Sequence, residues 1–214
     1  MQTEDLIQSL AARPAPVAPG AVTRRVLIGL GLGAATSVGL MIAWLGVRPD
    51  LQNAVATGMF WVKFAYTLLT GLLLTAALTR LARPGANVGP FAVAIAAPLA
   101  VMVAMAAMRM ANAAPDLRTS LLMGDSADVC PWRIFVIGLP VLAGAVWAVR
   151  GLAPTRLTLA GLVAGGCAGA FGAAIYGFHC DETASPFVVI WYTLGMAAVA
   201  VLGALAGSRS LRWR

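Results

Sequence analysis

The only histidine of the chain stands beside a cysteine and two acidic residues, in the stretch Gly177-Phe178-His179-Cys180-Asp181-Glu182. Thiolate and imidazole groups are good ligands for zinc, copper and cadmium. A second cysteine, Cys130, could supply another thiolate. The sequence therefore gives a set of candidate sensing residues, Cys130, Cys180, His179 and Asp181, and a set of candidate metal ligands, Cys130, Cys180 and His179. Zn, Cu or Cd would be the ion.

Three interpretations of these residues stay open on the sequence alone. Cys130 and Cys180 could form a disulfide or redox pair, they could bind a metal or react with an electrophile, or they could be idle thiols in a polar loop. A disulfide would close a loop of about 50 residues, worth roughly 4 kcal/mol in a soluble protein by the chain-entropy model. The third cysteine, Cys167, lies in an apolar run and is predicted to be an inert packing residue.

Other signatures of catalysis are absent from the sequence. It contains no Walker loop, no His-Glu-x-x-His and no Cys-x-x-Cys, and a single histidine makes most acid–base enzymes hard to build. We predict that the protein is not an enzyme and requires no cofactor. Lys63 lies near the start of an apolar run, where we expect it to snorkel to the outer interface. The Met102, Met105 and Met108 stripe is expected to serve packing.

The elements that carry these residues are predicted to be membrane-spanning helices. Of the 214 residues, 60% are hydrophobic and 11% charged, and the mean hydropathy is +0.86. Soluble domains are about half apolar and about a quarter charged. An α-helix of about 20 residues crosses the hydrocarbon core. We therefore predict an all-α bundle of six transmembrane helices, at about 26–47, 58–79, 89–108, 132–149, 157–178 and 187–207.

The basic residues predict the orientation of this bundle, because cytoplasmic loops carry the excess of arginine and lysine. The segment before the first helix, the second and fourth loops and the tail together hold ten arginines, against four on the opposite side. We predict a cytoplasmic N-terminal segment (1–25), a membrane domain (26–207) and a cytoplasmic basic tail (208–214). In a bacterial inner membrane, Cys130 and Cys180 would then face the periplasm.

Small residues recur every fourth position in the fifth apolar run, at Gly161, Gly165, Gly169, Ala173 and Gly177. Such a face lets another helix approach closely. We expect this helix to be packed within the bundle, and a homodimer seam is the alternative.

The N-terminus begins with Thr3-Glu4-Asp5-Leu6-Ile7-Gln8-Ser9-Leu10, followed by a proline-rich stretch from Pro14 to Pro19. Leu6, Ile7 and Leu10 would share one face of a short amphipathic helix. Twelve residues are too few for a stable isolated helix, so we expect this segment to be disordered or loosely helical without a partner.

The whole pattern resembles the NrsF family of bacterial membrane anti-sigma factors. The resemblance rests on the opening Thr-Glu-Asp-Leu-Ile-x-x-Leu, the six-helix layout, the outward Cys130 and Cys180, and the outer-loop pieces 178–182, 185–187 and Trp191-Tyr192.

The resemblance implies a protein that holds an extracytoplasmic-function sigma factor inactive at the membrane and releases it when the outer cysteines sense metal or oxidative stress. The sigma factor and the lipid bilayer would be its partners, with no direct contact to nucleic acid. The candidate sigma-binding residues are Glu4, Asp5, Leu6, Ile7 and Leu10. The alternative is a small transporter or metal-handling permease that uses Lys63, the Met102 stripe and the outer Cys/His mouth.

Overall fold

Six long helices dominate the computed structural model, which describes residues 3–11, 18–85, 89–152 and 154–211. All regular structure in these residues is helical. Each of the six is long and apolar enough to cross a membrane, which confirms the six expected runs to within a few residues at most ends. They are α2 (Ala21–Trp44), α4 (Gly58–Leu81), α5 (Gly89–Ala111), α7 (Cys130–Arg150), α8 (Leu157–Tyr176) and a final stretch from Ser185 to Ser210.

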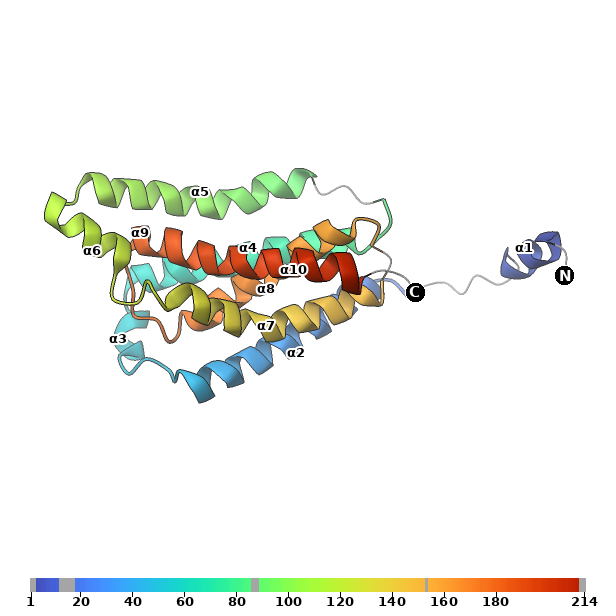
Figure 1. Cartoon of the computed structure of the whole chain (residues 1–214), viewed down its shortest axis with the longest axis horizontal. Coiled ribbons are helices and arrows are strands. Elements are labelled where there is room, and N and C mark those ends of the chain that lie inside the picture. The colour runs from blue at the N-terminus through green and yellow to red at the C-terminus, as the bar shows by residue number, and fades with distance from the viewer. Residues whose placement is uncertain (1–2, 12–17, 86–88, 153, 212–214) are drawn as a thin grey trace.

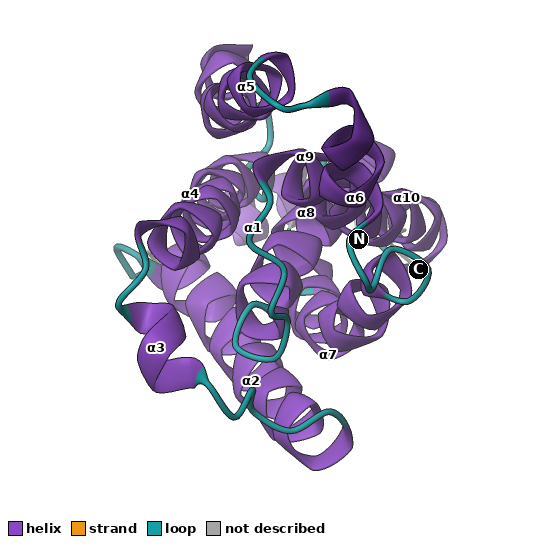
Figure 2. Cartoon of the chain, turned by 90° about the vertical axis from the view of Figure 1, so that its left-hand side faces the viewer, coloured by secondary structure: helices purple, strands orange, loops and turns teal. Residues whose placement is uncertain are grey.

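The six helices lie side by side in one bundle, with α8 near its centre and α5 at its periphery (Figures 1 and 2). The central place of α8 follows from its composition, because its small side chains let α10 (Thr193–Ser210), α7 and α4 pack closely on it. Most of α8 is buried, whereas α5 is largely exposed. The core of the molecule is therefore built around α8.

The glycine face of α8 is occupied by α10 of the same chain. A Cβ at Gly161 would lie 2.2 Å from the Gly203 carbonyl oxygen, and one at Gly165 would lie 2.4 Å from that of Val199. Only glycine permits this backbone approach. Packing within the bundle, the expected role of this stripe, is confirmed, and this face is not available to a second copy.

A second close seam joins α2 to α7. A Cβ at Gly29 would lie 2.4 Å from the Gly144 carbonyl oxygen, and one at Gly33 would lie 2.6 Å from the Val141 Cα. One turn further on, the buried Ser37 hydroxyl donates a 2.6 Å hydrogen bond to the Ile137 carbonyl. Small residues at every fourth position of α2 therefore hold it along most of α7.

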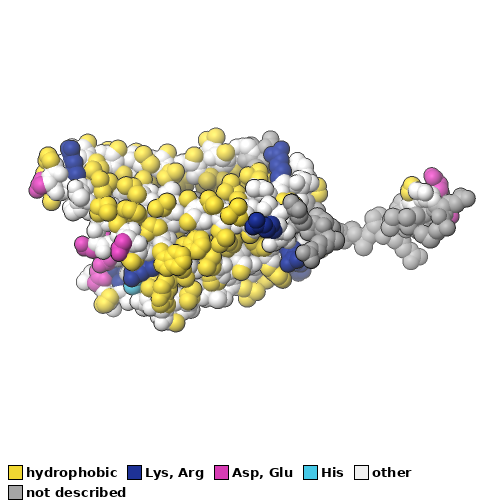
Figure 3. All heavy atoms as spheres, viewed as in Figure 1, with side chains coloured by type: hydrophobic (Ala, Val, Ile, Leu, Met, Phe, Trp, Pro, Cys, Tyr) yellow, Lys and Arg dark blue, Asp and Glu magenta, His cyan; other side chains and the backbone are white. Residues whose placement is uncertain are grey.

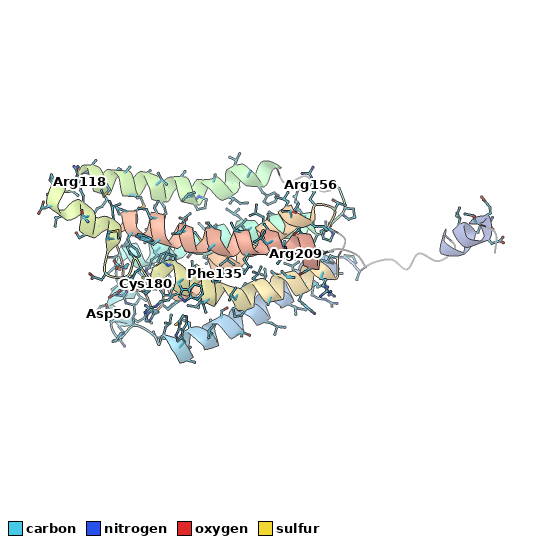
Figure 4. All side chains as sticks on the ribbon, in the orientation of Figure 1. Asp50, Arg118, Phe135, Arg156, Cys180 and Arg209 are labelled. Atoms are coloured by element: carbon cyan, nitrogen blue, oxygen red, sulfur yellow. The ribbon has the colours of Figure 1, made fainter. Side chains whose placement is uncertain are left out.

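Charged side chains gather at the two ends of the bundle, with an apolar band between them (Figure 3). Asp50, Arg118 and Cys180 lie at one end, here called the cysteine end (Figure 4). Arg156 and Arg209 lie at the opposite end, here called the arginine end. The acidic side chains of the bundle are seen at the cysteine end, as the distribution in the sequence predicts.

Three short helices in the connections at the cysteine end were not expected from the sequence. They are α3 (Leu51–Val55), η1 (Pro115–Leu117) and α6 (Arg118–Met123). Each has fewer than two turns, so it is too short to show a helical period in its apolar residues.

The N-terminal segment forms a helix of its own, α1 (Thr3–Ala11), which Figure 1 shows beyond the arginine end of the bundle. Glu4, Asp5 and Ile7 are exposed on it. The side chains of Leu6 and Leu10 lie outside the described part of the structure, as do residues 212–214 of the basic tail.

Candidate thiol site

Cys130 and Cys180 meet at the cysteine end of the bundle. Cys130 is the first residue of α7, and Cys180 follows α8 by four residues. Their side chains are within hydrogen-bonding reach of each other, and both thiols are free. The exposed fractions are 0% for Cys130 and 3% for Cys180. The structure thus brings together the two cysteines that the sequence singled out, and shields them from solvent.

Glu182 ties the two cysteine-bearing loops together. Its Oε1 accepts hydrogen bonds from the Asp125 backbone N–H at 2.7 Å and from the Ser126 hydroxyl at 3.3 Å. Gly124 makes room for this carboxylate: its φ is +52°, and a Cβ there would collide with Glu182. The loop that precedes Cys130 is therefore held against the loop that contains Cys180.

Two cations converge on the backbone of Cys180. Its carbonyl oxygen accepts hydrogen bonds from Lys63 Nζ at 2.9 Å and from Arg48 Nη1 at 3.1 Å. Arg48 also binds Asp50 through two bonds of 2.7 Å, whereas Lys63 Nζ makes its second bond to the Glu182 carbonyl at 2.9 Å. The expectation that Lys63 snorkels to the interface is wrong. Only 2% of the residue is exposed, because the Cys180 loop folds over it.

Two tyrosines complete the wall of the site. Tyr176, the last residue of α8, lies next to Cys130, and Tyr192 lies next to Cys180. A π-helical segment, η2 (Val188–Tyr192), sets Tyr192 on the buried side of the last span. Such widened turns are frequent at functional sites. The Tyr192 hydroxyl is buried and lies next to the Cys180 sulfur.

His179 and Asp181 are not placed as metal ligands beside the thiols. The His179 Nδ1 pairs with the Gly46 carbonyl at 3.0 Å, and its Nε2 lies 3.3 Å from an Arg133 guanidinium nitrogen. Asp181 is exposed. In the described part of the chain, no three side chains of the His, Cys, Asp or Glu type are grouped as they would be around a metal ion. The arrangement therefore favours a two-thiol site over the Cys130–Cys180–His179 set.

The surroundings of Cys180 favour its thiolate. Its pKa is lowered to about 6, chiefly because the Cys130 side chain hydrogen-bonds to its sulfur. Burial opposes this shift, whereas the charge of Lys63 and a hydrogen bond from Tyr192 add to it. A thiolate is the form of cysteine that attacks electrophiles and binds soft metals. Cys180 is thus the nucleophilic member of the pair.

Sequence reasoning missed Arg48, Tyr176 and Tyr192 as parts of the site. One signal was available for Arg48: a basic residue at the edge of an apolar run, on the same side as the cysteines. Tyr176 and Tyr192 gave no such signal, because aromatic residues near helix ends are common.

The comparison with known proteins places the chain in a family. A family model described as negative regulator of sigma F, NrsF, matches residues 10–213. The chain belongs to the NrsF family. It is 42% identical to the anti-sigma-F factor NrsF of Caulobacter vibrioides, with all of both chains covered. It is equally similar to the probable anti-sigma-F factor NrsF of Azospira oryzae, again over all of both chains. No solved structure matches the chain.

Membership of the NrsF family confirms the resemblance inferred from the sequence. The family description is that of a regulator, not of an enzyme. The family model begins at residue 10, so it does not reach Glu4, Asp5, Leu6 or Ile7, whereas the alignments with both curated NrsF proteins span the whole chain.

Proposed function

We propose that this NrsF family member is a membrane-bound anti-sigma factor that holds an extracytoplasmic-function sigma factor inactive and releases it when Cys130 and Cys180 react. The observation that carries the proposal is the full-length similarity to two proteins named as anti-sigma-F factors. The buried pair of free thiols supports the proposed sensing by Cys130 and Cys180. A purely structural role would not require two reduced thiols to lie next to each other.

The proposed place of the protein is the bacterial inner membrane, with both termini in the cytoplasm. Six helices of spanning length support this, and so do the arginines at the end opposite the cysteines. In this orientation α1 lies on the cytoplasmic side, where a sigma factor would be, and the thiols lie near the periplasm.

Two reactions of the thiol pair fit the site. With hydrogen peroxide, the two thiols lose two electrons and two protons, the S–S bond forms, and the O–O bond breaks to give two molecules of water. With Zn, Cu or Cd as the signal, an ion would displace the thiol protons and bind both sulfurs. Recruiting His179 as a further ligand would require it to leave Gly46 and Arg133.

A route from the thiols to the sigma factor runs through α7 and α2. Cys130 begins α7, and α2 packs along α7 through Gly29, Gly33 and Ser37. The residues that precede α2 carry α1. A hundredfold release of the sigma factor requires about 2.7 kcal/mol of differential binding, which is within the range of one disulfide or one metal site.

The test is retention of the sigma factor by the purified complex in detergent or nanodiscs, before and after addition of cadmium or peroxide. We expect the wild-type protein to release its partner, and the Cys130→Ser and Cys180→Ser variants to keep it. Cys167→Ser is the matched control, since Cys167 is buried away from the thiol site, beside Thr75. Release that persists in the Cys130→Ser/Cys180→Ser double variant would overturn the sensing role. A chain that retains no sigma factor at all would overturn the anti-sigma role.

A further inference from the structure

Lys63 is a buried cation whose hydrogen-bond partners are neutral. Its ammonium group donates to the carbonyl oxygens of Cys180 and Glu182, and lies 5.5 Å from the centre of the Tyr192 ring. Among the described residues, the ion pair formed at this end joins Arg48 to Asp50, so the nearby carboxylate is already used. Lys63 therefore has three donors directed at groups that carry dipoles or a π face, but no full negative charge.

Burying the Lys63 ammonium group in this way costs free energy unless an anion forms beside it. Removing a charged amine from water carries a large penalty, which neutral carbonyls offset only in part. Two nearby sulfurs can supply a buried negative charge, those of Cys180 and Cys130, and the charge of Lys63 acts more strongly on Cys180. Asp181, which also acts on Lys63, is exposed and more screened.

We propose that Lys63 is the positioning residue that makes Cys180 the reactive thiol. Its two hydrogen bonds fix the backbone on both sides of Asp181. This fixed backbone holds the Cys180 sulfur against Cys130. Its positive charge stabilises the sulfur as the thiolate, and so favours attack by Cys180 over attack by Cys130. The inference deepens the proposed sensing function and rests on it for biological meaning, but it concerns thiol chemistry that is measured without a sigma factor.

The geometry also explains why the lysine comes from α4. The Cys180 loop lacks regular structure from residue 180 to 184, and its carbonyls need donors that a rigid element supplies. Lys63 sits one and a half turns into α4, and its Nζ reaches the carbonyls of the loop. Arg48 approaches from the α2–α3 connection, and its backbone N–H also donates to the Phe178 carbonyl at 3.1 Å. Loop, α2 and α4 are therefore joined at Cys180.

The test is the rate at which Cys180 is alkylated by iodoacetamide in purified full-length protein in nanodiscs, with each cysteine quantified by peptide mass spectrometry. We expect Lys63→Met to slow alkylation of Cys180 roughly tenfold near pH 7, because the thiolate fraction falls with loss of the charge. Lys63→Arg should restore most of the rate, because it keeps the charge and the donors. A cavity of about 230 Å³ beside Lys63 gives the larger guanidinium room. Arg109→Met is the matched control: it removes an exposed cation of α5 that lies at the same end.

Cys167 reports whether the bundle has stayed closed, since it is fully buried in α8. If Cys167 stays unreactive and Lys63→Met reacts as fast as the wild type, the proposal is overturned. It is also overturned if Lys63→Arg is as slow as Lys63→Met. If Cys167 reacts in Lys63→Met, the decision passes to Lys63→Arg and Lys63→Gln, which both keep donors, and equal rates in these two would refute a role of the charge. Sigma-factor retention is measured separately, so a failure of the anti-sigma role leaves these rates readable.

Discussion

Cys130 and Cys180 are neighbours because Cys130 begins α7, Cys180 follows the end of α8, and these two helix ends lie at the same end of the bundle. The connection between α7 and α8 at the arginine end is short, so the two helices lie side by side and their opposite ends meet. Around the two sulfurs, Lys63, Arg48 and Tyr192 supply charge and hydrogen-bond donors. The chemistry of the pair is therefore set by residues from several helices, and the pair is asymmetric.

This asymmetry predicts the pH dependence of Cys180 alkylation. A pKa of about 6, below the ordinary thiol value of 9.0, means that the thiolate dominates at neutral pH and is lost as the pH falls through about 6. The rate constant should be nearly flat between about pH 7 and 8 and fall about tenfold per unit well below 6. The charged and titratable groups that act on the sulfur are Cys130, Lys63, Arg48, Tyr176 and Tyr192.

The measurement is the rate of alkylation of Cys180 from about pH 5 to 9 in the Cys167→Ser background. Cys130→Ala should move the midpoint upward, since it removes the hydrogen bond that contributes most to the shift. A wild-type midpoint near that of a free thiol would contradict the assignment of Cys180 as the nucleophile.

At this scale the sequence revealed the types of residue but not their partners. The cysteines were recognisable because they stand in polar stretches on the same side of the bundle. The role of Lys63 was not, because its depth in α4 suits snorkelling equally well until the fold of the Cys180 loop is known. His179 looked like a ligand from its neighbours, but its ring is directed to Gly46 and Arg133.

At the scale of elements, glycine decides which helices touch. The stripe on α8 was read correctly as a packing face, since small residues every fourth position favour close approach. The partner could not be predicted, because α4, α7 and α10 are all apolar enough to serve. The structure assigns α10 to this face, and it assigns α7 to Gly29 and Gly33 of α2. Fold class and helix bounds follow from hydropathy alone, whereas the order of packing does not.

The α2–α7 seam predicts a sharp difference between two glycines of the same helix. Gly33→Leu places a Cβ 2.6 Å from the Val141 Cα, so α2 must move away from α7. We expect a loss of roughly 1–3 kcal/mol of stability, typical of overpacking. Gly31→Leu is the matched control, because a Cβ there meets nothing within 4 Å.

Thermal unfolding of the two variants in the same detergent gives the comparison. Gly33→Leu should lower the midpoint and weaken retention of the sigma factor, whereas Gly31→Leu should do neither. Equal midpoints would show that the seam is not tight, and would remove α2 as the proposed route from the thiols.

At the scale of the whole molecule, the two ends of the bundle differ in charge and in contents. The cysteine end carries the acidic side chains and the thiol site, and the arginine end lies toward α1. This polarity fits a protein that receives a signal on one side of a membrane and releases its sigma factor on the other. It was predictable from the arginine counts, because charge asymmetry acts on topology before any packing forms.

The proposed orientation is testable with introduced cysteines, because Cys130 and Cys180 lie at the same end of the bundle and do not report on the other end. In a background lacking all three cysteines, Asp116→Cys and Thr155→Cys place exposed thiols at opposite ends. We expect an impermeant maleimide to label Asp116→Cys in whole cells and Thr155→Cys only after permeabilisation. The reverse pattern would invert the topology and place the thiol site in the cytoplasm.

The N-terminal helix α1 is the element proposed to bind the sigma factor. Ile7 is 55% exposed on this helix, beside Glu4 and Asp5, and nine residues are too few for a stable helix without a partner surface. A short amphipathic helix of this kind binds by laying its apolar side chains into a groove.

The double substitution Leu6→Ala/Ile7→Ala should weaken binding of the sigma factor about 30-fold or more, as expected for anchors of the usual strength, and should leave the bundle unchanged. Gln8→Ala, an exposed position of the same helix, is the control. The measurement is capture of the sigma factor from matched amounts of inserted protein at low and high salt, since the acidic residues should make binding salt-sensitive. Equal capture by the double variant and the wild type would move the binding surface to the connections of the arginine end, where Arg156 and Arg209 lie.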